Sequence, residues 1–244
     1  IAVLGAKMCA AGDTLDIEGS GIDADFRPDQ VPVTWRGTDE SVARVPSPGE
    51  QVQGAEATVT FEGDSVVKTR RPREYRHPTL DERLRRERTR EEARLTSEAR
   101  RAGVATPLVR DIDPAETTIR FQRVGDCDLR EALTERTVRA TAKSLAAIHD
   151  AGFVHGDPTT RNVRVNRGPE SDDPTVFLID FGLGYYTRHA EDHAMDLHVF
   201  EQSLDGTADD ADALRTAAED AYEAVGDPAV LDRLSDIEGR GRYQ

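Results

Sequence analysis

The chain has 244 residues, of which 32 are Lys or Arg and 47 are Asp or Glu, so its formal net charge is −15 at pH 7. This length suffices for one large domain or two small ones with a proper core. Only three basic residues are Lys, and an acidic chain almost without Lys favours a halophile, where crowded carboxylates maintain solubility. Two cysteines and no apolar run of about 20 residues exclude a disulfide framework, a thiolate zinc site and a membrane span. We therefore expect a soluble, cytoplasmic protein without a membrane partner.

The beginning of the chain differs in character from the rest. Residues 1–36 start without Met in an apolar, Ala-rich run, and Gly19, Gly21 and Pro28 rule out one long helix. Residues 37–49, GTDESVARVPSPG, are small and polar and contain Pro, as linkers do. We expect a fragment of a longer protein at 1–36, a linker at 37–49 and one domain at 50–244.

The elements predicted within residues 50–244 fall into two lobes. ATVTFEGDSVVKT (57–69) predicts two strands joined at Gly63. A Thr79/Glu82 capping box after Pro78 predicts the start of a helix that ends before Gly103. Strands are expected at 104–110 and 117–124, helices near 128–150, a hairpin from NVRVN (162–166) to TVFLID (175–180), and helices thereafter. The fold class is α+β: a small β-rich N-lobe with one helix, at about 50–124, and a mainly helical C-lobe, at about 125–244.

Four features that suit phosphoryl transfer occur in one order. They are a strand Lys (Lys68), an acidic residue in the next helix, H-G-D-x4-N ending at Asn162, and D-F-G beginning at Asp180. The Lys can hold ATP phosphates, with the helix carboxylate fixing its position. Asp157 can accept the proton of an attacking hydroxyl or orient a water, while Asn162 and Asp180 offer oxygen ligands to Mg²⁺. Each feature alone is more often structural, as a surface Lys, a cap or a turn. Their order in fitting local structure favours a functional site.

These motifs resemble a protein kinase of a small, ancient kind. HGD in place of HRD is shared with RIO kinases and with small-molecule kinases of the aminoglycoside type. RRPREYRHPTLDERLRRERTREEARL, HGDPTTRNV, IDFGLGYY and DLHVFEQSL resemble the kinase subunit of the KEOPS complex, the RIO-like Bud-site-selection family, over roughly residues 50–244. Residues 1–36, through IAVLGAKMCAAG, DIEGSGIDADFRPDQV and VTWR, resemble the C-terminal tail of the KEOPS threonylcarbamoyl transferase, of the ASKHA superfamily. The two subunits are one polypeptide in some archaea. A metal-binding Asp of the transferase would lie upstream, so no transferase activity is assigned.

The resemblance implies roles for further residues. QGAEATV would be the glycine-rich loop, with Gly54 and Ala55 near ATP, although an ordinary strand-edge turn is the alternative. Among the helix acids Glu87, Glu91 and Glu92, the pattern REEARL favours Glu92. Adenine would meet the backbone near Gln122, Arg123 and Val124, with Phe121 behind it. Asp196 would brace the catalytic loop, the alternative being a surface Asp, and His155 is a packed structural brace rather than an acid or base.

The resemblance also implies an activity and partners. ATP and Mg²⁺ are the expected cofactors of a Ser/Thr-type kinase/ATPase that supports threonylcarbamoyladenosine formation on tRNA. Its partners would be the transferase fused in cis, other KEOPS subunits, and tRNA, reached indirectly or through basic patches. Residues 68–101, with 13 Lys or Arg and 7 Asp or Glu, are either such a patch or a solvated helix with paired charges.

Other activities remain open from the sequence. Only 62 residues follow Gly182 and they contain no A-P-E motif, which argues against a general protein kinase. The first alternative is a dedicated Ser/Thr protein kinase acting on itself or on a partner. The second is a nucleotide-binding scaffold without turnover, and a small-molecule kinase is a further one.

Overall fold

The computed structural model describes residues 49–54, 56–166 and 175–241 of the chain. The first lobe is a five-stranded antiparallel sheet with strand order β1-β2-β3-β5-β4. Its strands are β1 (Gln51–Gln53), β2 (Ala57–Glu62), β3 (Ser65–Arg70), β4 (Val109–Asp113) and β5 (Thr118–Gln122). The fragment expected at 1–36 and nearly all of the expected linker lie outside the described residues, so these domain boundaries stay a prediction.

The predicted β2–β3 hairpin places a cationic residue in the centre of the sheet. Gly63 turns the chain with a φ of 61°, a left-handed conformation that suits glycine. Lys68 then pairs with Val59 on one side and with Ile119 of β5 on the other. Because alternate residues of a strand share a face, Arg70 projects from the same face of β3 as Lys68.

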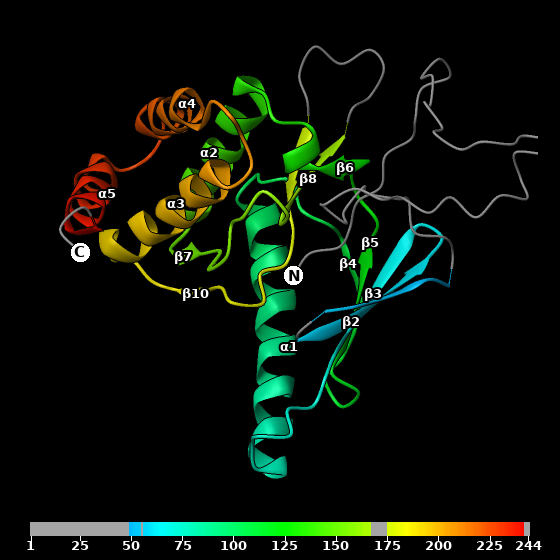
Figure 1. Cartoon of the computed structure of the whole chain (residues 1–244). Coiled ribbons are helices and arrows are strands. Elements are labelled where there is room, and N and C mark those ends of the chain that lie inside the picture. The colour runs from blue at the N-terminus through cyan, green and yellow to red at the C-terminus, as the bar shows by residue number, and fades with distance from the viewer. Residues whose placement is uncertain (1–48, 55, 167–174, 242–244) are drawn as a thin grey trace, which may run out of the picture.

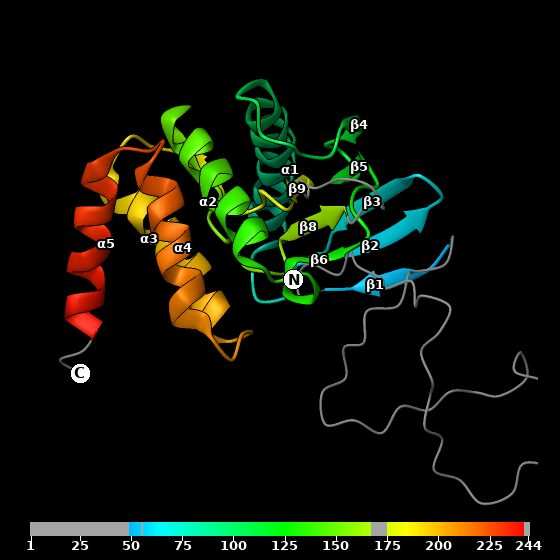
Figure 2. The ribbon, with the colours of Figure 1, turned by 90° about the horizontal axis from the view of Figure 1, so that it is seen from above.

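A single long helix, α1 (Pro78–Arg101), lies between the sheet and the helical lobe (Figures 1 and 2). Its buried residues recur at helical spacing along one face, and they include Thr89, Glu92, Ala93 and Thr96. The predicted capping box is wrong: the N-cap is His77, without a side-chain hydrogen bond, and Pro78 takes the first helical turn.

The helical lobe holds the larger core. Its helices are α2 (Glu135–Asp150), α3 (Ala190–Asp205), α4 (Ala211–Glu223) and α5 (Pro228–Gly241), with a short η2 (Leu129–Glu131) before α2. Its strands are β6 (Cys127–Asp128), β7 (Phe153–Val154), β8 (Val163–Asn166), β9 (Thr175–Leu178) and β10 (Tyr185–Tyr186). The core includes Leu145, Phe153, Phe200 and Tyr222, and it reaches Leu95 of α1. None of the described helices has the length and apolar character needed to cross a membrane.

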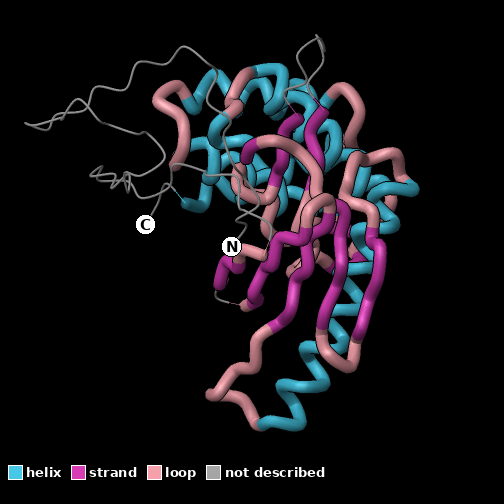
Figure 3. Tube along the Cα trace, turned by 90° about the vertical axis from the view of Figure 1, so that its right-hand side faces the viewer, coloured by secondary structure: helices cyan, strands magenta, loops and turns pink. Residues whose placement is uncertain are grey.

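The two-lobed α+β arrangement expected from the sequence is therefore present (Figure 3). The predicted hairpin from 162 to 180 is also present, as the antiparallel pair β8–β9. The strand expected at 104–110 is displaced, because β4 begins only at Val109. Residues 104–108 are held by other contacts: Thr106 donates its hydroxyl to the carbonyl of Thr96, and the amide of Leu178 donates to Ala105.

Candidate active site

A buried ion cluster joins the sheet, α1 and the start of the D-F-G segment. The Nζ of Lys68 lies 2.6 Å from Oε1 of Glu92 and 2.7 Å from Oδ1 of Asp180. Arg70 donates to the other oxygen of Glu92, whose side chain is 1 % exposed. The structure thus brings Lys68 together with Glu92, whereas Glu87 and Glu91 pair with Arg83 and Arg94 on the outer face of the helix.

The charges in this cluster set one another's protonation. Burial raises the pKa of Asp180, but the ammonium of Lys68 outweighs it and holds that pKa at about 2. Burial lowers the pKa of Lys68, but the carboxylates of Asp180 and Glu92 reverse this and raise it. The lysine therefore stays an ammonium and Asp180 a carboxylate at neutral pH.

The H-G-D segment lies across the cleft and is held by two braces. Asp196 of α3 accepts from the amides of His155 (2.6 Å) and Gly156 (2.8 Å). The buried imidazole of His155 accepts from the amide of Asp157 at Nδ1, so its Nε2–H donates to the carbonyl of Ile179 at 2.9 Å. Both side chains lie where a brace is expected, inside the loop rather than facing the cleft.

Gly156 occupies a position that no other residue fits. Its φ is 84°, and a Cβ placed on it would lie 2.3 Å from the carbonyl oxygen of Leu183. The backbone that follows the D-F-G motif therefore passes directly against the residue before Asp157. This approach explains a glycine between His155 and Asp157 in physical terms.

Asn162 links the H-G-D segment to a candidate cation position. Its Nδ2 donates to Oδ2 of Asp157 at 2.9 Å and to the Asp157 carbonyl at 2.7 Å. Its Oδ1 is buried and has no hydrogen-bond partner among the described residues. An orphaned amide oxygen beside the Asp157 carboxylate is an oxygen donor of the kind that Mg²⁺ prefers, and the carboxylate of Asp180 at both cavities is another, so the chemistry of both side chains fits the ion.

Two adjoining cavities form the cleft between the lobes. The first, of about 620 Å³, is mostly apolar and reaches the segment that joins the lobes. It is lined by Val59, Phe61, Val66, Lys68, Glu92, Thr96, Pro107, Phe121, Gln122, Arg123, Val124, Ile179 and Asp180. The second, of about 650 Å³, shares Val59, Lys68 and Asp180 with it and adds Gly54, Arg70 and Asp157. One cavity suits a flat apolar ring, and the other a charged group.

The expected ATP-contacting residues are placed as follows. Gln122 and Val124 line the first cavity, and the Gln122 amide already donates to Leu108. Gly54 lies between β1 and β2, where its amide donates to Ala57 at 2.8 Å and its carbonyl accepts from Arg71 at 3.3 Å. Ala55 lies outside the described residues.

The sequence prediction missed two arginines that shape the cleft. Arg70 holds the second oxygen of Glu92, and strand alternation from Lys68 was the signal that pointed to it. Arg164 of β8 donates to Asp128 at 2.6 Å and to the carbonyl of Gly125 at 3.0 Å, which anchors the segment between the lobes. No local sequence signal links Arg164 to that segment, because the contact depends on the pairing of β8 with β6.

Many arginines of the basic stretch 68–101 form ion pairs in the structure. Arg83 and Arg86 pair with Glu87 and Glu82 one turn away on α1, and Arg85 pairs with Asp81. This pattern favours the alternative of a solvated helix with paired charges over an open anion-binding patch. A contact of this helix with tRNA stays a prediction.

The chain is similar over all of its length to curated archaeal proteins. It is 68 % identical to the "Probable bifunctional tRNA threonylcarbamoyladenosine biosynthesis protein" of Haloarcula marismortui. It is 63 % identical to the protein of the same name from Halobacterium salinarum and 39 % identical to that of Methanospirillum hungatei. In each case the alignment covers 100 % of this chain and 45 % of the relative, so the chain spans less than half the length of these proteins.

Solved structures with a similar fold include the Rio2 kinase. The Rio2 kinase of Chaetomium thermophilum, in its ADP/Mg²⁺-phosphoaspartate complex, superposes with a TM-score of 0.55 at 14 % identity, over 80 % of this chain and 71 % of that one. WaaP in complex with acyl carrier protein superposes with a TM-score of 0.53 at 20 % identity, over 80 % of this chain and 85 % of that one. No protein-family model matches the chain.

These similarities confirm the fold class and the family resemblance drawn from the sequence. The described residues have a Rio2-like, two-lobed kinase fold. The chain as a whole is homologous to part of the bifunctional tRNA threonylcarbamoyladenosine biosynthesis proteins, a family with members in haloarchaea.

Proposed function

We propose that the chain is the kinase-like part of a KEOPS system and that it binds and turns over Mg²⁺-ATP in support of threonylcarbamoyladenosine formation on tRNA. The observation that carries the proposal is Lys68 bound between Glu92 and Asp180 at the junction of an apolar cavity and a charged one. The tRNA role rests on the relatives' names, and residues 1–36 would be the tail of the transferase fused in cis. We also propose that the chain acts in the cytoplasm together with other KEOPS subunits.

The apolar cavity would take the adenine. Val59, Phe61 and Phe121 line it, and rings stack favourably on such side chains. Because the amide of Gln122 is engaged by Leu108, an adenine contact there would use the carbonyl oxygen of Gln122. The backbone of Val124 would supply the neighbouring contact, and Gly54 would lie over the phosphates.

The role of Lys68 would be to hold phosphate oxygens. Glu92 keeps the ammonium in place from one side, while Arg70 holds the other oxygen of Glu92. The contact between Lys68 and Asp180 would have to open on binding, because each group is then needed by the nucleotide or its ion. Preorganised cations of this kind stabilise the charge that develops during phosphoryl transfer.

Asp157 would act on the attacking oxygen. It lines the charged cavity, and Asn162 fixes its Oδ2. From there it can orient a hydroxyl or a water and accept its proton. Bound Mg²⁺, held by Asn162 and Asp180, would supply charge neutralisation on the phosphates.

Nucleotide titration with and without magnesium tests this proposal. Asp180→Asn should weaken Mg²⁺-ATP binding by about tenfold or more without weakening metal-free ATP binding, since it removes an ion ligand and also the carboxylate that occupies Lys68. Lys68→Met should weaken both forms. The matched control is Asp150→Asn, an exposed carboxylate at the end of α2. The assigned site would be rejected if ATP affinity did not depend on magnesium, or if it were equal in the unchanged chain and the three variants.

A further inference from the structure

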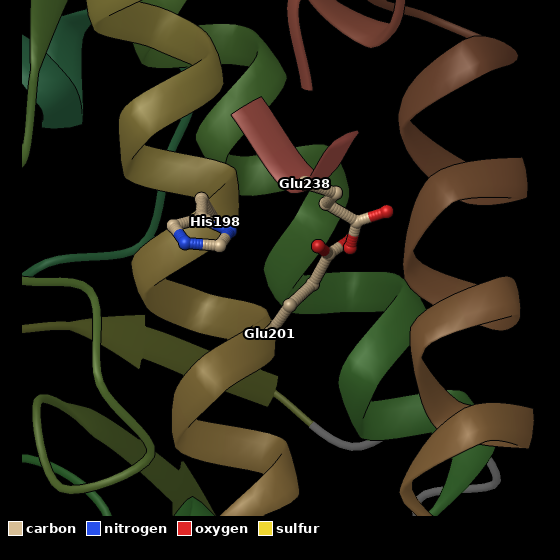
Figure 4. Close-up of side chains that lie close together, drawn as sticks. All are labelled: His198, Glu201 and Glu238. Carbon is tan, nitrogen blue, oxygen red and sulfur yellow. The ribbon is translucent and has the colours of Figure 1, made fainter. Parts of the chain in front are cut away.

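A second cluster of ionisable side chains lies outside the cleft, where α5 meets α3. His198 and Glu201 are one turn apart on α3, and Glu238 faces them from α5. One potential ligand atom from each of the three lies within 4.8 Å of the others. Figure 4 shows the carboxylates of Glu201 and Glu238 turned toward each other with the imidazole beside them.

Glu201 is unusual among the described carboxylates of this lobe. Its side chain is 1 % exposed, and neither of its oxygens has a hydrogen-bond partner among the described residues. The nearby guanidinium of Arg215, on α4, is engaged by Asp205 at 3.3 Å and by Glu238 at 3.7 Å. A buried carboxylate left in this state is costly, so the site calls for a neutralising group.

The surroundings of Glu201 disfavour a negative charge on its carboxyl group, which either a proton or a bound cation can neutralise. Burial, and then the negative charges of Glu219 and Glu238, raise the pKa of Glu201 to about 8. Burial and the charge of Glu238 also raise the pKa of Glu219. One arginine therefore faces several acids, and a further positive charge would relieve their repulsion.

The imidazole of His198 indicates which class of cation the site would bind. The Nε2 of His198 lies 3.0 Å from the amide of Gln202, while its Nδ1 is buried without a partner among the described residues. If Gln202 turns its amide oxygen to Nε2–H, the Nδ1 lone pair is free to bind a metal. Mg²⁺ and Ca²⁺ prefer oxygen ligands alone, whereas one imidazole with two carboxylates suits Zn²⁺.

The distances are close to those of such a site. Ligand atoms about 2.0–2.1 Å from a tetrahedral zinc are about 3.4 Å apart. The three ligand atoms lie within 4.8 Å of one another, so rotations about the side-chain bonds of the two Glu residues would have to shorten these separations by at most about 1.4 Å. A fourth position would remain for water.

We propose that His198, Glu201 and Glu238 form a binding site for a divalent transition-metal ion, of which Zn²⁺ is the best match, and that the ion clamps α5 to α3. This site is independent of the ATP cleft. Its effect would be structural, because α5 is otherwise held by contacts such as those of Val230 and Leu234 with the main core. An ion bound only by the folded chain stabilises it.

The test uses the whole 244-residue chain, freed of metal by a chelator and then titrated with Zn²⁺. We expect one Zn²⁺ per chain, an X-ray absorption spectrum with one imidazole among oxygen ligands, and a rise in Tm on binding. Glu201→Gln and His198→Gln should each weaken binding by about tenfold or more. Asp232→Asn, an exposed carboxylate on α5, and Asp180→Asn, in the cleft, should bind Zn²⁺ like the unchanged chain.

The variants also separate a metal site from a merely structural acid. Without metal, Glu201→Gln should melt no lower than the unchanged chain, because it replaces a buried carboxyl group that has no hydrogen-bond partner among the described residues. Zn²⁺ should raise the Tm of the unchanged chain and of the two control variants, but not that of Glu201→Gln. If Glu201→Gln does not fold, Glu238→Gln and His198→Gln decide. Absence of stoichiometric Zn²⁺, binding unaffected by these substitutions, or binding lost only in Asp180→Asn would each overturn the proposal.

Discussion

Two residues at the cleft are held in a left-handed backbone conformation. Gly156 has a φ of 84° and Asp180 a φ of 64°. The conformation is strained for an Asp, and it persists because Lys68 binds the side chain and the amide of Gly182 donates to the same oxygen. The glycine at the first position and the bound Asp at the second indicate that surrounding contacts fix the backbone of both the H-G-D and the D-F-G segments.

Gly156→Ala tests the close approach at the first of these positions. The added methyl group meets the Leu183 carbonyl as well as the unfavourable φ, so we expect a loss of about 3 kcal/mol in unfolding free energy. Gly103→Ala is the control, since its φ is 88° and its Cβ would meet nothing within 4 Å. It should lose only about 1 kcal/mol in denaturant unfolding. Equal losses of unfolding free energy in the two variants would show that the contact with Leu183 does not add to the destabilisation.

Glu92→Gln tests the buried ion cluster. The substitution leaves Lys68 and Arg70 without their shared carboxylate, and breaking a buried pair costs about 3–5 kcal/mol. Glu87→Gln removes an exposed pair with Arg83 on the same helix and should cost under about 1 kcal/mol. Thermal and denaturant unfolding would measure both. A Glu92→Gln chain as stable as the control would contradict the central place given to this carboxylate.

At the scale of elements, α1 connects the two lobes. Its Ala93 packs with Ile119 and Phe121 in the sheet, whereas Leu95 and Ala99 belong to the larger core. The sequence predicted this helix because its pattern is long and uninterrupted. The prediction of the N-cap of α1 was wrong because Pro78 can begin a helix without a side-chain acceptor, and a capping box is only a local preference.

Arg164→Lys tests the anchor between β8 and the segment joining the lobes. Lysine keeps the positive charge but lacks the guanidinium group, which donates to Asp128 and to the Gly125 carbonyl at the same time. We therefore expect a loss of about 2 kcal/mol in unfolding free energy. Nucleotide affinity should fall as well, because Val124 and Gly125 would no longer be held. Arg136→Lys, exposed on α2, should change stability by less than about 0.5 kcal/mol. Unchanged stability and affinity in Arg164→Lys would count against the anchor.

At the scale of the whole molecule, the sequence predicted what motifs and local periodicity determine. The order of the expected strands and helices predicted the two lobes, and the order of Lys68, Asp157, Asn162 and Asp180 predicted a site for phosphoryl transfer. It could not reveal contacts made by segments far apart, such as Arg164 with Gly125. The Glu201–Glu238 pair was equally hidden, because each residue alone reads as an ordinary helix-surface acid.

We have proposed that this cleft turns over Mg²⁺-ATP and that Asp157 acts there on the attacking oxygen. The most direct measurement follows both free phosphate and phosphoprotein from labelled ATP in molar KCl, for the unchanged chain, Asp157→Asn and the control Asp150→Asn. We predict magnesium-dependent release of free phosphate that falls about 100-fold or more in Asp157→Asn alone. Label retained on protein would instead favour the dedicated protein kinase. No turnover, or turnover that survives the loss of Asp157, would contradict the account.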